Sequence, residues 1–192
     1  MELISLRDEE FDSLYPIKIR KVSGTHWTPV DVAKNAIEFL NEKGKQAVLD
    51  LGSGAGKFCL VAAANSDAII TGVEQRENLV QLSRKLAAKY QVLNLNFIHD
   101  DLQRIDFAQY DAFYFFNAFE ENINLLNKLD KDDQINIDLY TSYIMLIRDK
   151  FAALPKFTRI VTYCGEAKEI PDCYRLVKSG SKGKLRFWQK EI

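Results

Sequence analysis

The chain has 192 residues, of which 47% are hydrophobic and 28% charged, and its formal net charge is −1. This length fits one domain with a complete hydrophobic core. The near-zero net charge does not favour a phosphate-rich partner, although it leaves a nucleic-acid partner open. Three cysteines and two histidines are too few for a disulfide framework or a histidine-based metal site. We therefore expect no metal.

The N-terminus begins with an acidic segment and has no long apolar run, so we expect no signal peptide, no membrane span and a cytoplasmic location. We predict that residues 1–27 form an N-terminal extension and that residues 28–192 form the main domain. Within the extension, one side of a helix is predicted to carry Leu3, Leu6, Phe11 and Leu14. Thr28 followed by Pro29 predicts a helix over 29–40, with the threonine side chain as its N-cap.

Strands and helices alternate along the rest of the chain. Apolar runs predict strands at 47–49, 68–73, 95–98, 111–117 and 157–164. Helical spacing predicts helices at 58–64, 77–90 and 133–154. The link at 165–172 is too short for a crossover helix, and two segments joined by SGSKGK, 173–178 and 185–190, predict a β-hairpin. The pattern therefore predicts an α/β fold, with a doubly wound, mostly parallel seven-stranded sheet that ends in an antiparallel hairpin.

The segment AVLDLGSGAGKF, residues 47–58, predicts a buried strand, a glycine-rich turn and a buried helix. A P-loop would need glycine at Leu51 and a hydroxyl at Phe58, so that interpretation fails. A dinucleotide fingerprint would need a third glycine at Lys57 and matches imperfectly. A purely structural turn remains an alternative.

Polar residues follow several of the predicted strands. Glu74 ends the second strand, 20 residues after Gly54, and an acidic residue at this offset binds the ribose hydroxyls in nucleotide-binding βαβ units. Asp101 follows the third strand and Asn117 ends the fourth. Each acid could instead serve at a helix start. In open parallel sheets the carboxyl ends of the strands form the ligand-binding edge, so we expect these groups to lie there.

The segments WTP, DLGSGAGKFC, GVEQR, DAFYFFN and VTYCG resemble class I S-adenosylmethionine (SAM) methyltransferases, in particular a small bacterial group of unassigned substrate. The resemblance covers residues 24–192. It implies SAM as the cofactor and a Rossmann-like fold. The cofactor-binding residues that it implies are Asp50, Gly52, Ser53, Gly54, Glu74, Gln75, Asp101, Leu102 and Asn117.

The acceptor side is expected where the fourth strand ends, at FFNAFEEN. This segment resembles strand ends of amino-group methyltransferases, although Ala118 stands in place of a proline. It implies Asn117 and Phe119 as catalytic residues, with Asn117 accepting hydrogen bonds from the target amine. The resemblance also implies that the extension, residues 1–27, acts as an active-site lid, and that the substrate or lid residues are His26, Trp27, Thr28 and Tyr114. Simple packing is the alternative for His26 and Trp27.

The function predicted from the sequence is SAM-dependent transfer of a methyl group to an amino nitrogen of a protein or small-molecule acceptor. The main alternative is a non-catalytic module that binds a nucleotide or a partner on a methyltransferase fold. An NAD-dependent oxidoreductase is a third, more distant interpretation. The sequence does not identify the acceptor or the oligomeric state.

Overall fold

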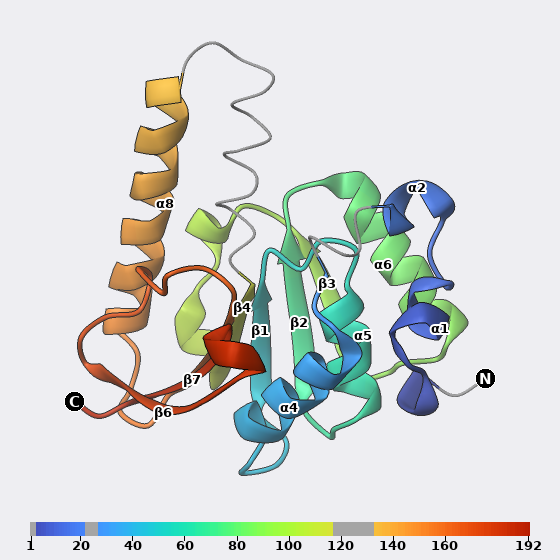
Figure 1. The fold of residues 1–192 in the computed structure, drawn as a ribbon, viewed down its shortest axis with the longest axis horizontal. Helices are drawn as coiled ribbons and strands as arrows, with labels where there is room; N and C mark the ends of the chain where they lie inside the picture. The colour runs from blue at the N-terminus through green and yellow to red at the C-terminus, as the bar shows by residue number, and fades with distance from the viewer. Residues whose placement is uncertain (1–2, 22–26, 117–132) are drawn as a thin grey trace.

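The computed structural model describes residues 3–21, 27–116 and 133–192. In this part of the chain, seven strands form one sheet in the order β3-β2-β1-β4-β5-β7-β6 (Figure 1). The strands are β1 Ala47–Leu51, β2 Ile69–Glu74, β3 Leu95–His99, β4 Ala112–Phe116, β5 Arg159–Tyr163, β6 Tyr174–Gly180 and β7 Leu185–Lys190. Strands β1 to β5 pair in parallel, whereas β7 is antiparallel to both β5 and β6. The predicted fold class is confirmed, including the terminal hairpin.

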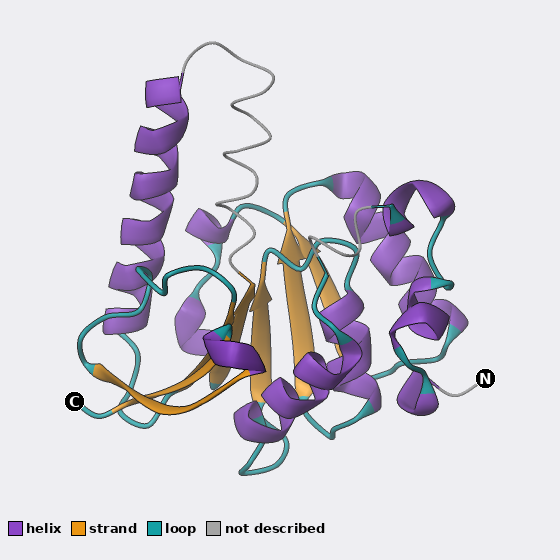
Figure 2. Cartoon of the chain, viewed as in Figure 1, coloured by secondary structure: helices purple, strands orange, loops and turns teal. Residues whose placement is uncertain are grey.

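Helices cover the sheet on both faces (Figure 2). The α-helices are α1 Asp8–Asp12, α2 Ile17–Arg20, α4 Val30–Leu40, α5 Lys57–Ala64, α6 Glu77–Lys89 and α8 Asp133–Ala152. Short 3₁₀ helices are η1 Leu3–Ser5, η2 Leu102–Arg104, η3 Phe107–Gln109 and η4 Ser181–Gly183. One core joins α4, α5 and α6 to one face of the sheet, and a second core joins α8, η2 and η3 to the other. None of the described helices is both long and apolar enough to cross a membrane.

The strand order reverses between β1 and β4, because β2 and β3 lie on one side of β1 and β4 and β5 on the other. Leu51, the last residue of β1, pairs with Phe115 of β4. The chain therefore leaves both strands side by side at the carboxyl edge. In doubly wound sheets this topological switch point is where ligands bind.

The N-terminal segment departs from the single predicted helix. It forms η1 and α1 as separate elements, although Leu3, Leu6 and Phe11 are all buried in the core as the pattern implied. The break has a local cause, since the Arg7 backbone N–H donates to the Glu10 carboxylate at 3.0 Å and a new helix begins at Asp8. Apolar spacing fixed which side chains point inward, while local polar bonds interrupted the helix.

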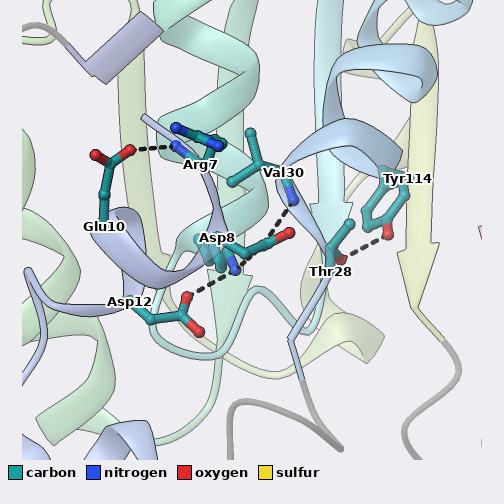
Figure 3. A network of polar contacts seen from close by, with 8 residues as sticks. Arg7, Asp8, Glu10, Asp12, Thr28, Val30 and Tyr114 are labelled. Atoms are coloured by element: carbon teal, nitrogen blue, oxygen red, sulfur yellow. Dashed lines mark hydrogen bonds and ion pairs between the residues drawn. The ribbon is translucent and has the colours of Figure 1, made fainter. Parts of the chain in front are cut away.

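The predicted N-cap of the helix at 30–40 is also wrong. The Thr28 hydroxyl makes no capping bond and instead lies 2.7 Å from the Tyr114 hydroxyl. The Val30 N–H donates to Asp8 Oδ1 at 2.9 Å, so an aspartate from α1 satisfies this helix end (Figure 3). A carboxylate near a helix N-terminus is favourable wherever in the chain it comes from.

Candidate cofactor site at the carboxyl edge of the sheet

The glycine loop after β1 has the conformation that the sequence predicted. Gly52, Gly54 and Gly56 adopt positive φ angles of 75°, 56° and 79°, which L-residues with side chains adopt at a cost. A Cβ on Gly56 would lie 2.8 Å from the Phe97 ring, so this position also requires glycine for packing. A Cβ on Gly52 or Gly54 would meet nothing within 4 Å. The outer side of the loop is therefore open to a ligand.

The Ser53 side chain points toward the sheet rather than outward. A Cβ on Gly72 of β2 would lie 2.7 Å from Ser53 Oγ, so Gly72 leaves the space that this side chain fills. Among the described residues Ser53 Oγ is buried without a hydrogen-bond partner. Any contact of this hydroxyl with a cofactor would require its rotation, whereas the loop backbone is already exposed.

Asp50 is buried beneath the same loop. Its Oδ2 accepts a hydrogen bond from the Cys59 thiol at 3.0 Å. Burial raises the pKa of Asp50 to about 7, the Cys59 hydrogen bond opposes this rise, and the nearby Glu74 adds to it. Burial also raises the pKa of the Cys59 thiol. Asp50 thus joins β1 to α5 through a buried hydrogen bond.

Glu74 contacts the glycine loop directly. Its Oε2 accepts a hydrogen bond from the Gly54 N–H at 3.0 Å, which joins the end of β2 to the loop after β1. Arg76 supplies three further donors to the Glu74 carboxylate: its backbone N–H at 2.8 Å, Nε at 2.8 Å and Nη2 at 3.1 Å. These bonds to Glu74 raise the pKa of Arg76. Arg76 is not among the site residues predicted from the sequence.

The predicted residues after β2 and β3 lie close together. Gln75 is exposed, and its carbonyl oxygen lies 3.0 Å from His99 Nε2. Asp101 Oδ1 accepts the Gln103 N–H at 2.9 Å and the Tyr143 hydroxyl at 2.7 Å. It therefore caps η2, as the alternative interpretation held, while Leu102 is buried in the second core.

Lys57 begins α5 immediately after the loop, and its side chain is only 5% exposed. Its Nζ lies 2.6 Å from Asp8 Oδ1 and 2.7 Å from Asp12 Oδ1, both from α1. It also lies over the Trp27 ring, 5.6 Å from the centroid. A signal for this cluster was present in the sequence, because Asp8 and Asp12 share one helix side and a lysine in an apolar helix needs a partner.

The residues expected to form the substrate site or lid differ in how deeply they are buried. Trp27 is half-buried and packs against Tyr15, with ring centroids 4.5 Å apart. Tyr114 is fully buried, stacked on Phe58 at 3.7 Å. In this structure the ring therefore lies inside the core against α5, and its role at the substrate site stays a prediction. Thr28 is buried beside it.

Three predicted site residues, His26, Asn117 and Phe119, lie outside the described residues. Within 3–21, 27–116 and 133–192, no group of three metal-ligating side chains is found.

The described residues fit an adenosyl cofactor. The loop offers exposed backbone at Gly52 and Gly54, where a Cβ would occupy the open side. The helix α5 directs its free N–H groups toward the loop. Glu74 places a buried carboxylate on the same edge, in contact with the loop. Hydroxyl groups of a ribose are suitable partners for such a carboxylate.

A family model described as "Methyltransferase domain" matches residues 41–162. The fold is similar to an RNA methyltransferase from Salinibacter ruber solved with S-adenosyl-L-homocysteine, with 22% identity, a TM-score of 0.57, and coverage of 85% of this chain and 92% of that one. It is also similar to TrmN from Thermus thermophilus, with 16% identity, a TM-score of 0.62, and coverage of 85% and 49%. At these identities the likeness shows the fold.

One sequence relative is the 23S rRNA (uracil(1939)-C(5))-methyltransferase RlmD of Shewanella sediminis, which is 38% identical over 71 residues. The match covers 37% of this chain and 16% of that protein. The similarity thus concerns a short part of a much longer enzyme.

Proposed function

Because the chain belongs to the methyltransferase domain family, with SAM as the cofactor of this domain, we propose that it transfers the SAM methyl group to an amino nitrogen of a protein or small-molecule acceptor. The observation that carries the cofactor part is the 3.0 Å hydrogen bond between the glycine loop and Glu74 at the switch point. It joins the two sequence features that the family resemblance relies on.

In this proposal the loop residues Asp50, Gly52, Ser53 and Gly54 surround the methionine end of the cofactor, with Glu74 on the ribose. Gln75, Asp101 and Leu102 form the adenine end. The hydrogen bonds that Asp101 accepts from Gln103 and Tyr143 both use Oδ1, so Oδ2 can contact the cofactor while Oδ1 caps η2. We further propose that residues 1–27 act as an extension and lid, since α1 already holds Lys57 at the start of α5.

The acceptor is proposed to bind beside the end of β4. Register supports this position, because Phe115, near the end of β4, pairs with Leu51, the last residue of β1 before the glycine loop. When bound, SAM supplies an electrophilic methyl group. A neutral amine can attack it without a general base, so the protein needs to align the amine and exclude water. In this role Asn117 would accept hydrogen bonds from the amine, and Phe119 would exclude water.

The proposal is tested by incubating the protein with methyl-labelled SAM and fractionated cell extract, and by counting label in protein, RNA and small molecules. Asn117→Ala is the diagnostic variant. Loss of a group that acts mainly in the transition state lowers turnover by about 100-fold while S-adenosylhomocysteine affinity stays within a few-fold. Equal turnover per folded molecule would remove Asn117 from the mechanism. A chain that binds the cofactor and labels no fraction would favour the non-catalytic binding module.

A second candidate, an RNA acceptor, is favoured by one surface. Four cations occur within nine residues of the C-terminal hairpin, Lys178, Lys182, Lys184 and Arg186, and none pairs with a carboxylate among the residues that the structure describes. The hairpin tip reaches the carboxyl edge, since Cys164 N–H donates to the Lys184 carbonyl at 2.8 Å. RNA is also the substrate named for two of the similar proteins.

The RNA candidate predicts salt-dependent binding of polyuridylate. Each lysine–phosphate contact on a single strand contributes about 0.7 units to the slope of log affinity against log salt. Replacing Lys182 and Lys184 by Gln should reduce the slope by roughly 1.4, whereas replacing the exposed Lys85 and Lys89 of α6 should leave it unchanged. Equal slopes for both double variants would contradict the hairpin as an RNA-binding surface.

A further inference from the structure

Every acceptor direction of the Glu74 carboxylate is already used. Oε1 accepts the Arg76 backbone N–H and Nε, and Oε2 accepts the Gly54 N–H and Arg76 Nη2. A carboxylate offers about four lone-pair directions. The Glu74 side chain is only 3% exposed, so solvent water has little access to the carboxylate.

The four donors differ in their freedom to move. The two backbone N–H groups are fixed by the loop and by the end of β2. The Arg76 guanidinium contributes the other two bonds, and its side chain is 57% exposed. A ribose needs two acceptor positions for its two hydroxyls, and only the guanidinium can vacate two positions without unfolding the loop.

We propose that Arg76 is a specificity-determining residue that occupies the ribose subsite of the cofactor-free protein and swings out when a ribose binds. This inference rests on the proposed role of Glu74 as the ribose ligand. The guanidinium makes binding selective, because a ligand with both hydroxyls replaces both lost bonds. A ligand without them leaves a buried carboxylate short of donors or fails to displace the arginine.

The direct test is the affinity of Arg76→Met for S-adenosylhomocysteine, measured by titration calorimetry on protein whose melting temperature is also recorded. This ligand has no net charge near pH 7, so removal of a cation changes little through long-range attraction. We expect affinity to rise by about 2- to 5-fold, the scale of a partly exposed charged pair that no longer has to break. Arg76→Lys, which retains a single donor group, should gain less. Unchanged or weaker binding in both variants would overturn the proposal.

Two comparisons locate the effect. Arg104→Met removes an exposed cation from the same edge, 3.4 Å from Asp100, and should not alter the affinity. Adenosine should gain affinity from Arg76→Met, whereas 2′,3′-dideoxyadenosine should not. An equal gain for both nucleosides, or a gain from Arg104→Met of the same size, would contradict displacement by the ribose.

Glu74→Ala separates this inference from the proposed function. If Glu74 binds the ribose, its loss should weaken S-adenosylhomocysteine by about 10- to 150-fold, and Arg76→Met should add no gain in that background. Unchanged affinity in Glu74→Ala would refute the ribose assignment itself. Weakened binding in Glu74→Ala, without any gain from Arg76→Met in the native background, would refute only the role of Arg76.

Discussion

Lys57→Met tests how the N-terminal segment is attached to the cofactor loop. Lys57 is almost fully buried, and its ammonium group has two carboxylate partners at 2.6 and 2.7 Å. Methionine retains most of the side-chain volume but removes the charge. The variant leaves Asp8 and Asp12 facing each other without a cation. The change therefore isolates the electrostatic contribution of one lysine.

The magnitude follows from the exposure of the three partners. Removing one member of a buried ion pair costs about 3–5 kcal/mol. Asp8 is 47% exposed and Asp12 20%, so water can solvate part of the charge that is released. We therefore expect a loss of about 3 kcal/mol in the free energy of unfolding. For a chain of this size each kcal/mol shifts the melting temperature by about 2–4 °C, which gives a decrease of roughly 6–12 °C.

The assay is thermal unfolding followed by circular dichroism and calorimetry. Lys168→Met is the matched control, because Lys168 lies 2.6 Å from Glu166 and both side chains are largely exposed. An exposed pair contributes about 0–1 kcal/mol, so the control should melt within about 4 °C of the native chain. Adding Asp8→Asn and Asp12→Asn to Lys57→Met should restore most of the loss, since no unpaired charge remains. Equal melting temperatures for Lys57→Met and the control would refute this reasoning.

Three further predictions follow from the loop and the strand beneath it. The folded-state pKa of Asp50, about 7, lies above the unfolded value of about 3.9, so its contribution to stability is fully present below pH 4 and lost as the pH rises to 7. Asp50→Asn removes this titration, so the difference in free energy of unfolding between the variant and the native chain should shift in favour of the variant by up to about 4 kcal/mol from pH 4 to pH 8. A difference that stays constant with pH would contradict the raised pKa of Asp50. Gly54→Val and Gly183→Val both place a side chain at positive φ in open space, so each should lose roughly 1–2 kcal/mol of unfolding free energy. Only Gly54→Val should abolish S-adenosylhomocysteine binding. Gly56→Ala adds a collision with the Phe97 ring at 2.8–2.9 Å to the same backbone strain, so its melting temperature should lie below that of Gly183→Ala.

Much of this fold could be predicted from local patterns. Apolar runs located the five parallel strands and the SGSKGK turn located the two hairpin strands, and the ten residues between β5 and β6 correctly implied the absence of a crossover helix there. Glycines at 52, 54 and 56 predicted a glycine-rich turn, and all three adopt positive φ, which few other residues do. The carboxyl-edge rule placed Glu74 beside the loop although 20 residues separate them, and the Gly54–Glu74 hydrogen bond confirms that proximity.

The tertiary structure decided which polar groups meet. Thr28 had the local signature of a helix cap, yet its hydroxyl bonds Tyr114, because Asp8 reaches Val30 from another element. Tyr114 was predicted at the substrate site, and the structure places its ring in the core, stacked on Phe58 of α5. Lys57 pairs with Asp12 of α1, a different element, and Arg76 pairs with Glu74 across a tight turn. Neither pairing follows from local sequence patterns. Periodicity determines the direction of apolar side chains, whereas the partners of buried charges depend on distances between elements that only the assembled sheet fixes.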